Sequence, residues 1–156
     1  MPQSGRALID LAPYTDPGRV RFLAPGLGKA SALRELAQAT AAHPAVGDLH
    51  GFIAAILERE RVSATGIGGG IAVPHAKLPT VSGFVITLGL AREGIDFQAR
   101  DGVPVQILVM IAASNRAPDD YLKLLATVAG RLKAPQVRSG MLAAPDPAAV
   151  LAAFLG

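Results

Sequence analysis

The sequence of 156 residues contains no cysteine and no tryptophan, and only 4% of its residues are aromatic. Without cysteine the chain can have neither a disulfide framework nor thiol chemistry, which is typical of a cytoplasmic protein. Because 51% of the residues are hydrophobic, the core must consist of Leu, Ile, Val and Ala with a few Phe. A chain of this length can fold as one domain around such a core.

Long hydrophobic runs and dense basic clusters are also lacking. The longest apolar run, 103–113, is interrupted by Gln106 and is too short to span a bilayer. The first ten residues lack the apolar segment of a signal peptide. The net charge is +3, but the basic residues are scattered and are not interleaved with aromatics, which argues against nucleic-acid binding. We therefore expect a cytoplasmic protein without direct membrane insertion, whose mild positive charge suits an anionic ligand or an acidic partner.

Helical periodicity alternates with apolar segments of strand length. Residues 1–17 hold three prolines and few periodic apolar positions, so we expect a loosely ordered N-terminal leader there and a single domain over 18–156. Strands are predicted over 20–23, 71–73, 84–90 and 105–112, and helices over 29–42, 49–61, 118–132, 136–143 and 147–155. This alternation predicts an α/β domain with a mixed β-sheet.

Two of the predicted helices have clear start signals. Asp48 is a plausible N-cap for the helix that follows it. Pro118 stands at the start of another, with Asp119 and Asp120 in its first turn. The apolar stripe of this second helix is Tyr121, Leu124, Leu125, Val128 and Leu132.

The segment 65–77, TGIGGGIAVPHAK, leads from a glycine-rich loop through a proline to a histidine. A histidine titrates near neutral pH, so its free ring nitrogen can act as a nucleophile toward phosphorus. Glycines let the backbone approach a ligand and turn its amides inward as an anion nest. His75 is therefore a candidate phosphoryl acceptor, and the candidate phosphoryl-binding residues are Thr65, Gly66, Gly68, Gly69 and Gly70. The alternative is a glycine-rich hairpin with a surface histidine at its end.

An arginine close to this segment is a second candidate. Arg59 lies at the end of a predicted amphipathic helix, and a guanidinium can bind a phosphoryl group at two points. Arg61 could play the same part, and spacing does not choose between the two. The alternative is a solvated arginine paired with Glu58 or Glu60.

Other motifs fail position by position. Ile71 occupies the last glycine position of a dinucleotide-binding pattern counted from Gly66. Leu23 and Ala30 stand where a phosphate loop needs Gly and Ser or Thr. His43 and His50 show no metal-ligand spacing, and no Ser-His-Asp arrangement is visible. We expect neither a metal nor an organic cofactor.

Several segments together resemble the EIIA domain of the fructose/mannitol class, a phosphocarrier of the bacterial phosphoenolpyruvate-dependent sugar phosphotransferase system. Nitrogen-regulatory EIIA proteins belong to the same class. The resemblance runs from about Val20 to the C-terminus and rests on segments 58–60, 65–68, 71–75, 94–97, 101–105 and 122–126. It implies a mixed sheet flanked by helices on both faces, with His75 as the phospho-acceptor and Arg59, rather than Arg61, as the arginine of the site. It also implies an HPr-like phosphocarrier protein as donor, and an EIIB domain or a regulatory target protein as the next partner.

One position departs from the family pattern. Members usually carry a second active-site histidine where this chain has Tyr121. A tyrosine hydroxyl can make a hydrogen bond but stays neutral near pH 7, so it cannot place a positive charge beside a phosphoryl group. Alternatively, Tyr121 only belongs to the apolar stripe of its helix. Two functions follow as hypotheses: a working phosphocarrier, or a regulatory binding module of the same fold with weak or no phosphotransfer. We expect the chain to act alone, because it contains neither an EIIB-like cysteine motif nor a membrane domain.

Overall fold

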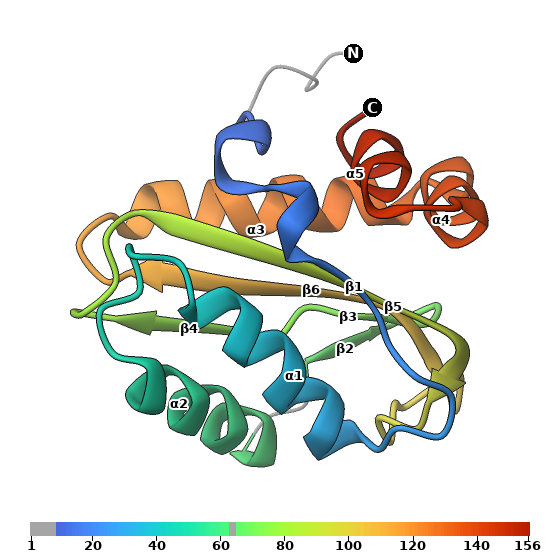
Figure 1. The fold of residues 1–156 in the computed structure, drawn as a ribbon, viewed down its shortest axis with the longest axis horizontal. Helices are drawn as coiled ribbons and strands as arrows, with labels where there is room; N and C mark the ends of the chain where they lie inside the picture. Colours follow the sequence, from blue (N-terminus) through green and yellow to red (C-terminus); the bar gives the residue numbers. More distant parts are fainter. Residues whose placement is uncertain (1–8, 63–64) are drawn as a thin grey trace.

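The computed structural model describes residues 9–62 and 65–156, which form a mixed β-sheet with helices on both faces (Figure 1). The strands are β1 (Val20–Phe22), β2 (Gly66–Gly68), β3 (Ile71–Ala72), β4 (His75–Leu78), β5 (Phe84–Ile95) and β6 (Val105–Ser114). The helices are α1 (Lys29–Ala41), α2 (Leu49–Val62), α3 (Pro118–Lys133), α4 (Pro135–Ala143) and α5 (Pro147–Leu155). The predicted α/β class is confirmed.

The sheet is built around the antiparallel pair β5 and β6. Its strand order is β1-β5-β6-β3-β2, and β4 also pairs with β6. Both β3 and β4 run parallel to β6 along the edge that β5 leaves free; β3 pairs with Ile107 and Leu108, and β4 pairs with residues 111–114. Val73 and Pro74 lie between these two strands. The Pro74 carbonyl accepts a hydrogen bond from the Ile111 N of β6 at 2.9 Å, and the residue pairing of β4 with β6 starts at His75.

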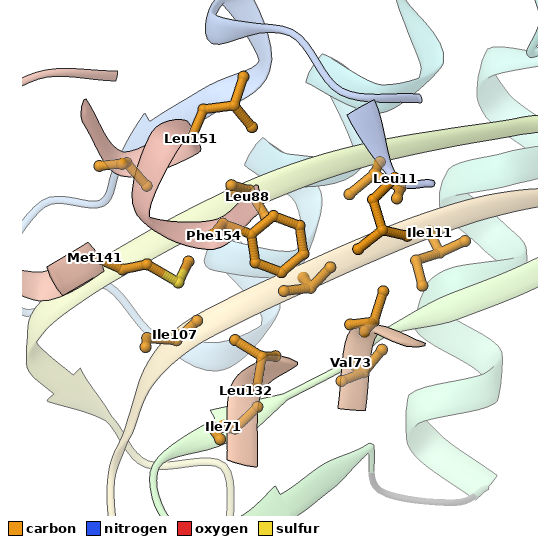
Figure 2. Packing of buried hydrophobic residues seen from close by; sticks show 14 of the residues in the cluster. Leu11, Ile71, Val73, Leu88, Ile107, Ile111, Leu132, Met141, Leu151 and Phe154 are labelled. Carbon is orange, nitrogen blue, oxygen red and sulfur yellow. The ribbon is translucent and has the colours of Figure 1, made fainter. Parts of the chain in front are cut away.

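Each face of the sheet has its own hydrophobic core. Along β6 the side chains alternate, as a strand requires, with Ile107, Val109 and Ile111 on one face and Leu108, Met110 and Ala112 on the other. Helices α3, α4 and α5 cover the first face, and α1 and α2 cover the second (Figure 1). Figure 2 shows Met141, Leu151 and Phe154 of the C-terminal helices gathered with Leu88 and Ile107 in the first core.

Both predicted helix starts are confirmed. Asp48 Oδ1 accepts a hydrogen bond from the Gly51 backbone N at 3.0 Å, as an N-cap does. Pro118 is the first residue of α3, with Asp119 and Asp120 in its first turn. No helix in the described part of the chain is long and apolar enough to cross a membrane.

The structure differs from the sequence prediction at the N-terminus. Of the expected loose leader, residues 1–8 lie outside the described residues. From residue 9 onward the chain packs onto the sheet: Leu11 is only 4% exposed, and Arg19 donates hydrogen bonds to the carbonyl oxygens of Tyr14 and Ile86. Two short 3₁₀ turns, η2 (Ala12–Tyr14) and η3 (Pro17–Arg19), replace the loose chain expected over 9–17.

Strand boundaries differ as well. Neither β2 nor β4 was predicted, and β5 continues past residue 90 to Ile95 after a register shift. After the shift, Gly94, with φ +83°, lies directly against Pro104. A Cβ built on Gly94 would be 2.6 Å from the Pro104 Cβ. Two segments that look unrelated in the sequence, 94–97 and 101–105, are therefore in contact.

Candidate functional site

The backbone fixes the tautomer of His75. The imidazole Nδ1 lies 2.7 Å from the carbonyl oxygen of Val73, two residues earlier. Since a carbonyl oxygen only accepts hydrogen bonds, Nδ1 must carry the hydrogen. In the neutral ring Nε2 then holds a lone pair, and it is the nitrogen that can act as a nucleophile.

His75 borders a pocket of about 250 Å³ formed by α2, the β2–β3 hairpin, β4 and α3. Its lining is mostly apolar and consists of Arg59, Thr65, Ile67, Val73, His75, Leu125 and Ala129. Arg59 and His75 are the ionisable members of this lining. Among the described residues, no group of three or more His, Cys, Asp or Glu side chains could hold a metal ion. The pocket therefore offers a nucleophile and one cation in an apolar surrounding.

The structure separates the two arginines that spacing left equivalent. Arg61 donates two hydrogen bonds to Glu58, from Nε at 3.1 Å and from Nη2 at 2.6 Å, and it does not line the pocket. Arg59 does line the pocket. Its exposed guanidinium makes no hydrogen bond or ion pair with any described residue, so the alternative pairing with Glu58 or Glu60 is not present. Arg59 is thus the cation that an incoming anion can reach.

A buried carboxylate joins the end of α2 to the start of β2. Glu60 is only 7% exposed and lies 2.8 Å from Lys29 Nζ. Its two oxygens also accept hydrogen bonds from the Thr65 hydroxyl at 2.6 Å and the Thr65 backbone N at 3.2 Å. Glu60 therefore holds Thr65 in the pocket wall, and the hydroxyl hydrogen of Thr65 is already committed to that carboxylate.

The glycines of the segment have a different place from the one predicted. Gly68, Gly69 and Gly70 have positive φ values of +89°, +66° and +82°; Gly68 ends β2, and Gly69 and Gly70 form the turn of the β2–β3 hairpin. The Gly69 backbone N donates to Asp101 Oδ2 at 2.9 Å, and Gly66 and Gly68 line a separate cavity of about 510 Å³. The amide expected to contribute to an anion nest thus already binds a carboxylate. Of the five predicted phosphoryl-binding residues, Thr65 alone lines the His75 pocket.

Tyr121, in the first turn of α3, faces His75. The two ring centroids are 6.0 Å apart with the planes at 52°. Tyr121 is 7% exposed and also packs with Leu124 and Val128, so it both belongs to the apolar stripe and borders the site. Burial raises the pKa of Tyr121, although the nearby Arg59 acts in the opposite direction. The hydroxyl is therefore neutral at pH 7.

The surroundings of His75 favour its neutral form. Burial is the main cause that lowers the pKa of this imidazole, and the cations Arg59 and Lys77 act in the same direction. The hydrogen bond to Val73 and the carboxylate of Glu60 oppose them, and the result is a pKa below the ordinary value of 6.5. At pH 7 most molecules therefore have an unprotonated Nε2.

Sequence reasoning gave no role to Lys77, which the structure places in this site. Its Nζ lies 5.0 Å from the centroid of the Tyr121 ring. His75 and Lys77 are the first and third residues of β4, and alternate residues of a strand lie on one face. A strand prediction over 75–78 would have grouped them, but the preceding proline and the shortness of the segment hid it.

Comparisons with known proteins give the site its context. The profile of the family "Phosphoenolpyruvate-dependent sugar phosphotransferase system, EIIA 2" matches residues 14–155. A nitrogen regulatory protein of Bradyrhizobium diazoefficiens is 32% identical over 141 residues, which cover 88% of this chain and 92% of that protein. The fructose-specific EIIABC component of Bacillus subtilis is 36% identical over 106 residues, covering 68% of this chain but 17% of the relative.

A solved structure shares the fold. The nitrogen regulatory protein IIA-Ntr of Neisseria meningitidis superposes with a TM-score of 0.84 at 20% identity, over 92% of this chain and 98% of that chain. The flanked mixed sheet predicted from the resemblance is therefore confirmed. Together with the match over nearly the whole chain, this leads to one conclusion. The chain belongs to the EIIA 2 family of the phosphoenolpyruvate-dependent sugar phosphotransferase system.

Proposed function

We propose that the protein is a cytoplasmic phosphocarrier that accepts a phosphoryl group on Nε2 of His75 from the phosphohistidine of an HPr-like carrier. The observation that carries the proposal is the 2.7 Å contact between His75 Nδ1 and the Val73 carbonyl oxygen. In the neutral ring this contact leaves the lone pair on Nε2, while Arg59, without a carboxylate partner among the described residues, lines the same pocket. Nucleophile and cation are thus both available to an incoming phosphoryl group.

The transfer is a displacement at phosphorus. The Nε2 lone pair of His75 forms the new N–P bond while the donor's N–P bond breaks, and the electron pair of that bond stays on the donor imidazole. The His75 ring, which keeps its hydrogen on Nδ1, becomes positively charged, and the Val73 carbonyl oxygen stabilises that charge. Arg59 balances the negative phosphoryl oxygens. The apolar walls of Ile67, Val73 and Leu125 limit competing attack by water.

We propose two destinations for the phosphoryl group. Transfer to an EIIB domain is supported by the Bacillus subtilis relative, which is named as an EIIABC component. A regulatory use of the phosphorylation state is supported by the nitrogen regulatory relative, which aligns over most of both chains.

The test is phosphoryl uptake from the upstream proteins. After incubation with phosphoenolpyruvate, enzyme I and an HPr-like carrier, the intact mass should increase by one acid-labile phosphoryl group. His75→Ala should abolish this increase. His50→Ala is the matched control, because His50 is exposed in the first turn of α2 and lies outside the pocket lining. Equal labelling of His75→Ala and wild-type protein would contradict the proposal.

A regulatory binding module with weak phosphotransfer is the second candidate. The observation that favours it is Tyr121, a neutral side chain at the position where the family resemblance implies a second histidine. Loss of one charge-assisted hydrogen bond would reduce the equilibrium constant for phosphoryl transfer about ten- to a hundredfold. Tyr121→His should then raise the labelling yield. A wild-type protein that labels fully, with no gain in Tyr121→His, would count against this candidate.

A further inference from the structure

Lys77 lies in the His75 site but has no part in the transfer described above. Ala76, between the two residues, is buried in the core under α1 and α2, so His75 and Lys77 share the opposite face of β4. The Lys77 side chain is exposed, with Nζ 5.0 Å from the Tyr121 ring centroid, and that ring is 6.0 Å from the imidazole. Lys77 has no carboxylate partner among the described residues.

We propose that Lys77 is a phosphoryl-binding residue: its ammonium group rests on the Tyr121 ring in the unmodified protein and moves to the phosphoryl oxygens once His75 carries them. Tyr121 is the positioning residue, because its ring keeps the ammonium close to the imidazole. The inference rests on the proposed function, since it concerns the phosphorylated state of the same histidine.

The charges around the site leave room for a second cation. Arg59 and Glu60 come from α2, Lys77 from β4 and Tyr121 from α3. Glu60 is already neutralised by Lys29 at 2.8 Å, so Arg59 is the remaining positive charge on the α2 side. A phosphoryl group adds a charge of about −1.5 to −2 near pH 7. The phospho-His75 ring and Arg59 offset most of that charge, but the only N–H of the ring is bound to the Val73 carbonyl, so Arg59 alone would donate hydrogen bonds to three phosphoryl oxygens. Lys77 would supply the further donors.

The ammonium can exchange partners at little cost. At an exposed site a cation–π contact is weak, and a lysine ammonium on its flexible stem has three donors to offer. A charge-assisted hydrogen bond to a phosphoryl oxygen is stronger than that contact. The ammonium contacts the face of the Tyr121 ring and not its hydroxyl. The pKa of the phosphoryl group should therefore be the same in Tyr121→Phe as in the wild type, and different in Tyr121→Leu.

The experiment phosphorylates His75 chemically, so that no protein donor is needed. With phosphoramidate as the reagent, its P–N bond breaks, ammonia leaves and the Nε2–P bond forms. The ³¹P resonance of phospho-His75 is identified by its loss in His75→Ala, and its pH titration gives the pKa of the phosphoryl group. A nearby cation lowers that pKa, so Lys77→Met should raise it by about half a unit to one unit. Lys77→Arg should restore the wild-type value.

Lys133→Met is the matched control, because it removes the same charge from the exposed far end of α3. An unchanged phosphoryl pKa in Lys77→Met, or an equal shift in Lys133→Met, would overturn the role of Lys77. A wild-type value in Tyr121→Leu would overturn the positioning role of Tyr121. A protein that no HPr-like carrier labels, but that shows the Lys77-dependent shift after chemical labelling, would contradict the proposed function while supporting this inference.

Discussion

The two halves of the segment 65–77 use their backbones for different purposes. In the first half, the glycines at 68–70 turn a hairpin, and the Gly69 amide binds the carboxylate of Asp101. In the second half, the Val73 carbonyl holds the imidazole of His75 in one tautomer. The glycines thus set the position of the chain, and the Val-Pro-His portion supplies the reactive atoms. Adjacent residues of one motif can therefore be separated by experiment into a structural group and a chemical group.

The largest expected effect is on the structural half. Gly70→Ala places a Cβ in a residue with φ +82°, 3.2 Å from the Pro104 carbonyl oxygen. We expect the free energy of unfolding to fall by about 2–3 kcal/mol, measured by urea denaturation. Phosphoryl uptake per folded molecule should not change.

Gly69→Ala is the control for Gly70→Ala within the same turn. Gly69 has φ +66°, but its Cβ would meet no atom within 4 Å. Gly69→Ala should therefore lower the free energy of unfolding only by the cost of a left-handed backbone conformation, about 1–2 kcal/mol. If either glycine variant folds normally but loses phosphoryl uptake, the assignment of a purely structural role to the glycines is contradicted.

The next effect concerns the chemical half. Arg59→Met removes the cation of the pocket, and we expect the equilibrium constant for phosphoryl transfer from an HPr-like carrier to fall about tenfold. Arg61→Met removes the same charge two residues away, from a side chain that is bound to Glu58. Intact-mass measurement gives the phosphorylated fraction of Arg59→Met and of Arg61→Met, and we expect a loss in Arg59→Met alone. Equal losses in both would mean that net charge, not the pocket, is responsible.

A smaller effect is expected at Asp101. Its carboxylate accepts hydrogen bonds from the Gly69 and Val103 amides, and these bonds lower its pKa. A depressed folded-state pKa gives stability that is present above the ordinary value, 3.8, and lost as the pH falls through the folded-state pKa. Asp101→Ala should therefore lower Tm slightly at pH 7, and the difference from wild type should shrink in strong acid, where the protonated carboxyl is only a neutral acceptor. Asp101→Asn, which keeps one acceptor oxygen, should lie between them.

The smallest effect is the pH dependence of His75. Its folded-state pKa is lowered mainly by burial, so the unfolded chain binds a proton first as the pH falls. The stability contribution is therefore present above pH 6.5 and lost as the pH falls through the lower folded-state pKa. NMR titration should give an imidazole pKa below 6.5, and Arg59→Met should raise it. A wild-type value at or above 6.5 would contradict this view of the site.

Local signals in the sequence were sufficient for much of the fold. The N-cap Asp48, the first-turn proline Pro118 and the apolar stripe from Tyr121 to Leu132 predicted α2 and α3, because such signals act within one or two helical turns. His75 was identified for a similar reason, since the glycines and the proline beside it are unusual as a group.

Contacts between distant residues explain the errors. The Gly69 amide binds a carboxylate 32 residues away, and Glu60 pairs with Lys29, so spacing could not show which groups were already occupied. The choice between Arg59 and Arg61 depended on the side-chain pair that Arg61 forms with Glu58. Lys77 required knowing that 75–78 is a strand, which its pairing with β6 establishes rather than its own composition.

The break between β3 and β4 has a consequence for how this protein can change. The group that selects the reactive nitrogen of His75 is a main-chain carbonyl, and every amino acid at position 73 would supply it. No side chain therefore determines which ring nitrogen carries the hydrogen. A substitution at position 73 keeps the carbonyl and does not move the hydrogen to the other nitrogen. Altering the tautomer would instead require an insertion or deletion at Val73 and Pro74, which would shift β4 along β6 and disturb the fold itself.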